Sequence, residues 1–149
     1  MIERLTAFFI LAKHFEGCRL MPYWDCAGVL TCGWGSTGYD VFPGKAWTQE
    51  YADKRLEQDA IKFAVGTLAA CPILATETDN RLSAITDFSY NLGLARLKGS
   101  TLRKKVNSAN WEGAKNQLKR WIWAGGKKLP GLVLRRAAEA NLLFPFNLK

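Results

Sequence analysis

The first sixteen residues carry apolar side chains at a helical spacing. The apolar positions are Leu5, Phe8, Phe9, Leu11, Ala12 and Phe15. This spacing places most of them on one face of an α-helix. Gly17 follows directly, and glycine commonly ends a helix because it adopts the left-handed conformation without strain. The pattern therefore predicts a helix over residues 3–16 with one buried face.

From Gly17 to about Pro43 the pattern changes. Seven glycines or prolines fall in this stretch, with aromatic and β-branched residues between them. The segment AGVLTCGWGSTG, residues 27–38, has the composition of short strands joined by tight turns. It predicts a small β-hairpin or a three-stranded sheet.

The rest of the chain has the pattern of helices with recognisable caps. Thr48 predicts the start of a long helix to about Ala70, and Thr78 predicts the start of another to about Leu92. The later signals are Ser100 and Asn110 as two more caps, a break at Gly125 and Gly126, and Pro130 in the first turn of a last helix to about Leu143. This order predicts a mostly helical α+β fold with its strands near the amino end. Residues 1–149 are the size of one domain, and no linker divides them.

The net charge of +8 is concentrated in one part of the chain. Residues 96–136 hold twelve Lys or Arg and a single acid, Glu112, which gives +11, whereas the other residues together carry −3. Such asymmetry favours a polyanionic partner, either nucleic acid or an anionic envelope surface. Solvated helix faces explain the charge equally well. Because the chain has no zinc-finger or RNA-recognition signature, we expect no nucleic-acid partner.

The cysteines and the single histidine argue against a metal site. Cys18, Cys26, Cys32 and Cys71 form no CxxC pair, and His14 is the only histidine. We expect no metal and no other cofactor. Four buried or half-buried thiols are expected, and a disulfide formed after export is the alternative.

The apolar run AFFILA, residues 7–12, is too short to be a signal core or a membrane span. A signal core needs about 7–15 apolar residues and a transmembrane helix needs about 20. The run is better explained as the buried face of the first helix. We expect the protein to be made, without a signal peptide, in a cytoplasm and to fold there.

Three polar side chains next to the first helix have a spacing that suggests chemistry. Eight residues separate Glu16 from Asp25, and five separate Asp25 from Thr31. The unpaired carbonyls of the helix end and the nearby rings of Phe15 and Tyr23 disfavour a carboxylate, so we expect Glu16 to keep a proton. Asp25 lies in a polar turn and should stay ionised.

One protonated and one ionised carboxyl are what glycoside hydrolysis requires. Glu16 would protonate the leaving oxygen, and Asp25 would serve the cationic centre or the attacking water. The hydroxyl of Thr31 would orient that water. The aromatic side chains that could pack on sugar rings are Tyr23, Trp24, Trp34 and Tyr39. The three polar residues also have ordinary explanations, as a solvated helix end, a turn residue and a strand former.

The motif Glu-x8-Asp-x5-Thr, followed by CGWGSTG at 32–38, resembles the catalytic signature of the phage-type lysozymes, the endolysins of glycoside hydrolase family 24. Residues 86–107, TDFSYNLGLARLKGSTLRKKVN, resemble that family's central Phe-x-Phe-Asn-x-Gly and Ser-Thr-Leu segment. Residues 120–143, RWIWAGGKKLPGLVLRRAAEANLL, resemble its carboxy-terminal Gly-Gly, Pro-Gly-Leu and Arg-Arg-x-x-Glu block. The four motifs occur in order and cover nearly the full length.

The resemblance implies a lysozyme-like fold of two lobes with a cleft between them. A small β-containing lobe would span about residues 14–60, and a helical lobe would span about 70–149 together with the first helix. The implied reaction is hydrolysis of the β-1,4 bond between N-acetylmuramic acid and N-acetylglucosamine in peptidoglycan. Glu16, Asp25 and Thr31 would keep the three roles given above.

The resemblance also implies substrate-binding residues. Tyr90 and Asn91 match the segment that lines the cleft from the helical lobe, and Trp34 is expected to contact sugar. Arg135 and Arg136 match the carboxy-terminal arginine pair. We expect Arg135 to contact the substrate, but the resemblance assigns the pair no firm role.

Two departures from the family pattern affect the biology. Ser36 stands where members often have His after the second glycine of Gly-x-Gly, and that position is not one of the three catalytic ones. Many relatives carry an amino-terminal signal-anchor, and we expect this chain to have none. We therefore expect release into the periplasm through a membrane lesion made by a separate phage protein, a holin. The expected partners are peptidoglycan glycan strands and an anionic outer-membrane lipid, and the expected state is a monomer.

Two other functions stay open at this point. A lytic transglycosylase cleaves the same bond with one acid and no attacking water, and the spacing of Asp25 and Thr31 argues against it. A non-enzymatic basic module that binds the envelope would explain the charge of residues 96–136. Such a module would be unaffected by loss of Glu16.

Overall fold

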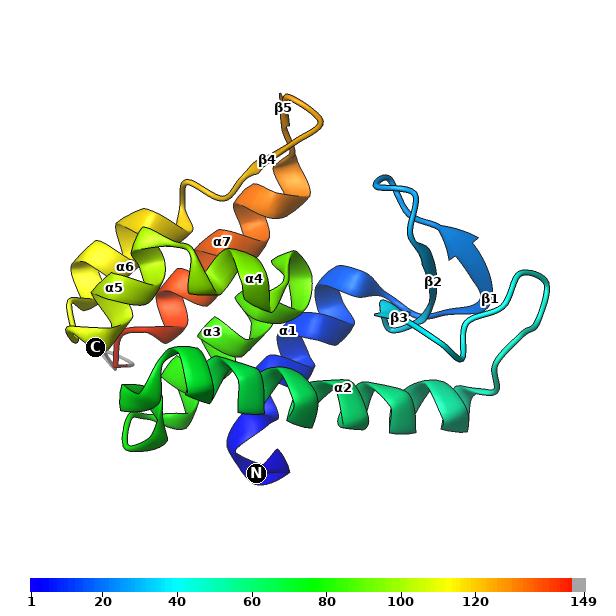
Figure 1. Cartoon of the computed structure of the whole chain (residues 1–149), viewed down its shortest axis with the longest axis horizontal. Helices are drawn as coiled ribbons and strands as arrows, with labels where there is room; N and C mark the ends of the chain where they lie inside the picture. The colour runs from blue at the N-terminus through cyan, green and yellow to red at the C-terminus, as the bar shows by residue number, and fades with distance from the viewer. Residues whose placement is uncertain (146–149) are drawn as a thin grey trace.

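A computed structural model describes residues 1–145 of the chain, which form an α+β fold (Figure 1). The strands are β1 (Arg19–Trp24), β2 (Leu30–Gly33), β3 (Ser36–Thr37), β4 (Trp123–Ala124) and β5 (Lys127–Lys128). The helices are η1 (Ile2–Leu5), α1 (Thr6–Glu16), α2 (Gln49–Ala70), η2 (Pro72–Ala75), α3 (Asp79–Leu92), α4 (Leu94–Lys98), α5 (Thr101–Asn107), α6 (Trp111–Leu118) and α7 (Pro130–Leu142). The predicted fold class, mostly helical with a small sheet near the amino end, is confirmed.

The helix starts follow the predicted caps. The capping residues are Thr48, Thr78, Ser100 and Asn110, and each side chain accepts a hydrogen bond from the backbone N–H three residues later. Each cap satisfies one of the backbone donors that a helix start leaves unpaired. The starts of α2, α3, α5 and α6 are therefore explained by local chemistry.

The hairpin of β4 and β5 differs from the prediction. Gly125 and Gly126 were predicted to break the chain, but they form a two-residue turn with φ of 58° and 77°. A hairpin turn with positive φ at both central residues favours glycine, which has no side chain to clash. The double glycine therefore reverses the chain and keeps β4 paired with β5. The short elements η2 and α4 were also not predicted.

The three-stranded sheet places the polar residues of the amino-terminal motif. β1, β2 and β3 are antiparallel in that order, and Tyr23 lies opposite Thr31. The turn between β1 and β2 carries Asp25. A register irregularity between Arg19 and Tyr23 bends the first strand. Asp25 and Thr31 therefore lie on one hairpin, beside the end of α1 that carries Glu16.

Helix α2 joins the two parts of the molecule. In Figure 1 it runs from the helical part to a position beneath the small sheet. The main core is built from the helices, around residues such as Phe8, Leu56 and Phe88. A second, smaller cluster under the sheet contains Cys32 and Trp47. Because α2 contacts both clusters, it fixes the sheet relative to the helices.

Within the run AFFILA, Phe8, Leu11 and Ala12 are buried on one face of α1, as predicted, and Ile10 is exposed on the other. Within residues 1–145, no helix combines the length and apolar character that crossing a bilayer requires. The expectation for the cysteines needs one correction. All four are free thiols, but Cys26 lies exposed on the turn between β1 and β2.

Candidate active site

A single cleft of about 620 Å³ brings the predicted catalytic residues together. Its walls come from the end of α1, the three-stranded sheet, α2, α3 and the β4–β5 hairpin. The lining includes Glu16, Tyr23, Asp25, Thr31, Gly35, Asp59, Tyr90, Asn91, Arg96 and Trp123.

Glu16 is the last residue of α1, and its carboxylate is ion-paired. The Oε2 atom lies 2.7 Å from Nη1 of Arg135, and the side chain is 21% exposed. The sequence indicates the helix carbonyls and the aromatic neighbours of Glu16 but not this cation. The contact is a charge-assisted hydrogen bond from the guanidinium to the carboxyl group. It also fixes the direction in which the carboxyl points.

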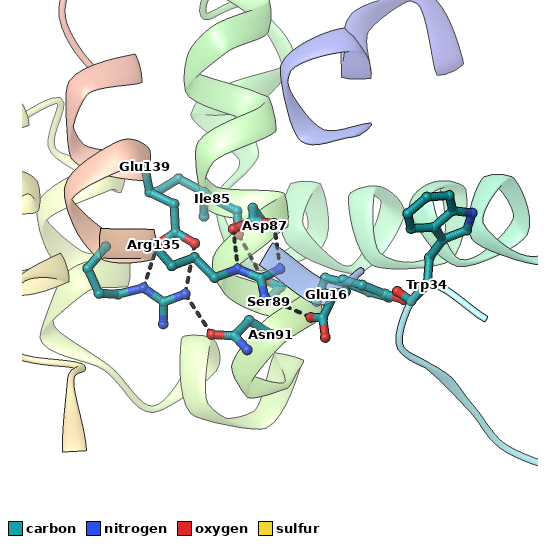
Figure 2. A network of polar contacts seen from close by, with 10 residues as sticks. Glu16, Trp34, Ile85, Asp87, Ser89, Asn91, Arg135 and Glu139 are labelled. Carbon is teal, nitrogen blue, oxygen red and sulfur yellow. Dashed lines mark hydrogen bonds and ion pairs between the residues drawn. The ribbon is translucent and has the colours of Figure 1, made fainter. Parts of the chain in front are cut away.

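Arg135 is held by a second carboxylate behind Glu16 (Figure 2). Its Nε and Nη2 atoms donate to the two oxygens of Asp87 over 2.9 and 2.8 Å. Burial alone would raise the pKa of Asp87, but the hydrogen bonds from Arg135 hold that pKa below its ordinary value. The predicted substrate contact of Arg135 is not what the geometry shows, because the side chain is buried and does not line the cleft.

Asp25 is oriented by the backbone of its own turn. Its Oδ1 atom accepts hydrogen bonds from the N–H groups of Ala27 and Val29 at 2.9 and 2.8 Å. Asp25 and Val29 also close the turn through the backbone, over 2.9 Å. In the described part of the chain, Oδ2 has no hydrogen-bond partner. One carboxylate oxygen is therefore fixed and the other can accept from a molecule in the cleft.

The hydroxyl of Thr31 is also oriented. Its Oγ1 atom donates to the carbonyl of Val29 over 2.9 Å, and the residue is 4% exposed. Because the single hydroxyl proton is used in this bond, the lone pairs of Oγ1 are left to accept. A water molecule beside Thr31 would have to donate a proton to it.

Of the predicted sugar contacts, Tyr90 lines the cleft and Trp34 does not. The hydroxyl of Tyr90 donates to the backbone carbonyl of Trp34 over 2.8 Å, and its ring packs against Phe8 and Phe63. The indole N–H of Trp34 donates to Oδ1 of Asp53, on α2, over 2.8 Å. The hydrogen bond from Tyr90 joins α3 to the connection between β2 and β3, and Trp34 takes part in it through its backbone carbonyl.

Asn91 lines the cleft as expected, and it is bound from behind by Arg136. Nη2 of Arg136 donates to Oδ1 of Asn91 over 2.7 Å (Figure 2). Arg136 in turn pairs with Glu139 on the same helix. The carboxy-terminal arginine pair therefore supports two different residues of the cleft, Glu16 and Asn91.

Several lining residues were not predicted. Trp123 on β4 is 61% exposed and faces the cleft, and recognition of the double glycine as a hairpin turn would have pointed to it. Asp59 on α2 accepts a 2.6 Å hydrogen bond from Ser36 and pairs with Arg55. Burial raises the pKa of Asp59 despite these contacts. Ser36, the departure from the family pattern, is thus a buried partner of a cleft carboxyl.

The arrangement brings two carboxyl groups, Glu16 and Asp25, and one oriented hydroxyl, Thr31, to one cleft. Within residues 1–145, no cluster of three or more His, Cys, Asp or Glu side chains could hold a metal ion. The chemistry available is proton transfer to a leaving oxygen and activation of a water molecule, which is that of a glycoside hydrolase.

The comparisons identify the family. Residues 13–139 match the phage lysozyme family, and the chain belongs to it. A SAR-endolysin of bacteriophage PS119 is 39% identical over 127 residues, which cover 85% of this chain and 75% of that protein. An endolysin of Escherichia coli O157:H7 phage FAHEc1 superposes with a TM-score of 0.80 at 31% identity, over 93% of this chain and 90% of that one. The muramidase domain of SpmX from Asticaccaulis excentricus has a TM-score of 0.82 at 26% identity, over 94% and 96%. The lysozyme-like fold is confirmed.

Proposed function

We propose that this member of the phage lysozyme family hydrolyses the β-1,4 bond between N-acetylmuramic acid and N-acetylglucosamine. As a phage endolysin the chain degrades peptidoglycan and lyses the host cell. The observation that carries the finer proposal is the single cleft that joins Glu16, Asp25 and Thr31. In this proposal the cleft lies between a β-containing lobe, about residues 14–60, and a helical lobe, formed by the described residues from about 70 onward together with the first helix.

Glu16 is the general acid in this proposal. Arg135 contacts Oε2, so the transferable proton resides on Oε1, the oxygen that lies against Gly35 in the cleft. Asp87 already compensates the charge of Arg135 through two hydrogen bonds. Arg135 can therefore orient the carboxyl while Glu16 gives its proton to the leaving glycosidic oxygen.

Asp25 and Thr31 together prepare the water. The water donates one hydrogen to Oγ1 of Thr31, whose own proton is bound to Val29. It donates the other to the free Oδ2 of Asp25, which accepts that proton as the bond forms. A lone pair of the water is then left to attack the anomeric carbon from the face opposite the acid.

A lytic transglycosylase is the competing function. It needs an acid but no water-binding pair, and the orientation of Asp25 and Thr31 would then have no use. The products decide between the two, because an anhydro-muramyl end is lighter than a hydrolysed reducing end by one water. Digestion of purified peptidoglycan should release muramic acid at new reducing ends.

Glu16→Gln tests the acid. The amide keeps the size of the side chain and can still accept from Arg135, but it has no transferable proton. General acid catalysis is worth about 10²–10⁴-fold, and we expect a loss of rate in that range. Glu57→Gln, on the exposed face of α2, is the matched control and should keep full activity. Near wild-type clearance of purified walls by the Glu16 variant would refute the assignment.

The route to the wall is a further part of the proposal. We propose that a separate phage holin opens the membrane for this chain, which then acts on the periplasmic wall as a monomer. The support is that Phe8, Leu11 and Ala12 of the apolar run are buried in the core of the fold. Expression of the chain in host cells with and without a holin tests this: rapid lysis by the chain alone would contradict it. An anionic outer-membrane lipid is proposed as a second partner of the basic region.

A further inference from the structure

Arg136 and Glu139 form a buried ion pair that the reaction described above does not use. Both lie on α7 and both are fully buried, as only paired charges can be at low cost. Nε of Arg136 is 2.8 Å from Oε1 of Glu139, and Nη2 is 2.9 Å from Oε2. Of these two contacts only that of Nη2 has hydrogen-bond geometry, and Nε approaches Oε1 as an ion pair alone. The guanidinium also lies over the ring of Phe88.

The same guanidinium reaches the wall of the cleft. Nη2 of Arg136 is 2.7 Å from Oδ1 of Asn91, a half-buried residue that lines the cleft with Glu16. A guanidinium can only donate hydrogen bonds, whereas a carboxamide has one accepting oxygen and one donating nitrogen. The atom of Asn91 that faces Arg136 must therefore be the oxygen, whichever way the amide would otherwise turn.

The contact with Arg136 determines which group of Asn91 is available in the cleft. Its oxygen is used by Arg136, and no residue of the described chain accepts from its Nδ2. Figure 2 shows Asn91 and Glu16, and both residues line the cleft. The group that Asn91 presents to a substrate is thus an N–H donor held in a fixed direction, and it will select an acceptor oxygen.

We propose that Arg136, supported by Glu139, is a positioning residue that makes Asn91 a donor for the carbonyl oxygen of a substrate N-acetyl group. The proposal rests on the glycan substrate given above. An amide carbonyl is the best neutral acceptor on an N-acetylated sugar, because hydroxyl and ether oxygens accept more weakly. A de-N-acetylated sugar lacks this carbonyl and presents an ammonium group, which cannot accept.

The test compares peptidoglycan with the same material after removal of N-acetyl groups. The measured quantity is the ratio of kcat/KM on acetylated material to kcat/KM on de-N-acetylated material. Asn91→Asp keeps the shape and the contact to Arg136 but removes the donor. We expect its ratio to fall about 3- to 10-fold, the range for one lost hydrogen bond, mainly through KM on the acetylated material. Asn116→Asp, exposed on α6, makes the same chemical change away from the cleft and should leave the ratio unchanged.

Arg136→Lys tests the positioning step. Lysine keeps the positive charge beside Glu139 but cannot hold both Glu139 and Asn91 in one plane. The carboxamide is then free to turn, and the ratio should fall in the same direction as for Asn91→Asp. Arg120→Lys, an exposed position, is the matched control. If Arg136→Lys does not fold, Glu139→Gln loosens the same guanidinium while the cation stays in place, and its ratio should fall.

The outcomes separate the possibilities. A ratio within twofold of wild type for Asn91→Asp would overturn the recognition of the acetyl group. A lowered ratio for Asn91→Asp with an unchanged ratio for folded Arg136→Lys and Glu139→Gln would overturn the positioning role. A purely structural role would lower activity on both materials in parallel and would leave the ratio unchanged. If the wild-type chain released no reducing muramic ends from either material, the proposed function would fail first.

Discussion

A β-carbon built on Gly35 would lie 2.8 Å from Oε1 of Glu16 and 2.9 Å from its Cδ. Gly35 also has a φ of +92°, which side chains rarely adopt. The backbone of the β2–β3 turn therefore lies directly against the proposed acid. Glycine is required here both for the chain direction and for the position of the Glu16 carboxyl.

Gly35→Ala should remove most activity without unfolding the protein. The methyl group would force the carboxyl of Glu16 away from its position, and misplacement of a catalytic group by about 1 Å can cost about 10²-fold in rate. The unfavourable φ adds about 1–2 kcal/mol of strain. Wall-clearance rates and thermal melting of the purified variant measure the two effects separately.

Gly131→Ala is the control for this substitution. Gly131 lies in the first turn of α7 with open space at the β-carbon position and without a positive φ. Alanine there should keep activity and slightly raise stability, because alanine favours helix over glycine. If Gly35→Ala cleared walls at the wild-type rate, close contact with Glu16 would not matter for catalysis.

Thr31→Val should slow the reaction with little change in substrate binding. The two side chains have nearly the same shape, but valine cannot bond to Val29 or accept from the water. We expect a loss of kcat of about 10-fold or more, with KM held within about twofold. Steady-state kinetics on a soluble glycan oligomer give both constants. Thr76→Val is a matched control and should have little effect on kcat, because Thr76 is exposed, does not line the cleft, and also donates its hydroxyl to a backbone carbonyl, that of Ile73.

The features that can be predicted from the sequence are those that residues close together in the chain determine. Each of the four predicted caps lies within three residues of the N–H group it binds, and the catalytic motif lies within one helix end and one hairpin. The contact between Glu16 and Arg135 spans 119 positions and joins α1 to α7. No periodicity or spacing encodes such a pairing, so the surroundings of Glu16 predicted from the sequence lack its nearest charge. Trp34 differs for a related reason: its residue type predicts a sugar contact, but its indole N–H binds Asp53 and the residue does not line the cleft.

Asp40 should stabilise the fold in a pH-dependent way. Burial would raise the pKa of Asp40, but hydrogen bonds from Arg55 and Tyr51 outweigh burial and hold the pKa below its ordinary value. A carboxyl whose pKa is lower in the folded state contributes stability above its unfolded pKa of about 3.9 and loses it as the pH falls through the folded value. Arg55 keeps its second partner, Asp59, when Asp40 is lost.

Asp40→Asn should therefore lower the free energy of unfolding by about 1–3 kcal/mol at pH 7, and the difference should shrink toward zero below about pH 3. Urea unfolding across this pH range measures it. Glu50→Gln removes an exposed ion pair with Lys54 and should cost less than about 1 kcal/mol. A penalty for Asp40→Asn that is the same at pH 7 and pH 3 would show that lost volume or lost hydrogen bonds, and not charge, explain it.

The basic residues of the helical part should act on wall binding and not on bond cleavage. Peptidoglycan and its attached acidic polymers are polyanions, and exposed charges attract over about 10 Å at 0.1 M salt but only about 3 Å at 1 M. Lys104 and Lys119 are exposed on or next to α5 and α6 and do not line the cleft. Reversal of both to Glu should weaken clearance of intact walls about as much as added salt does, and should spare a short soluble glycan.

Lys127 and Lys128 should behave differently from Lys104 and Lys119. They form β5, and Lys128 lies opposite Trp123, whose ring faces the cleft. Cross-strand neighbours share one face of a hairpin, so a reversed charge at Lys128 would be felt by any glycan that contacts Trp123. Reversal of this hairpin pair should reduce cleavage of the short glycan as well as of walls.

Measurement of both variants and the wild type on both substrates across a salt series separates the two effects. Parallel losses on both substrates for the Lys104 and Lys119 variant would mean that charge acts on folding or catalysis, and the attraction of the wall by distant lysines would be refuted.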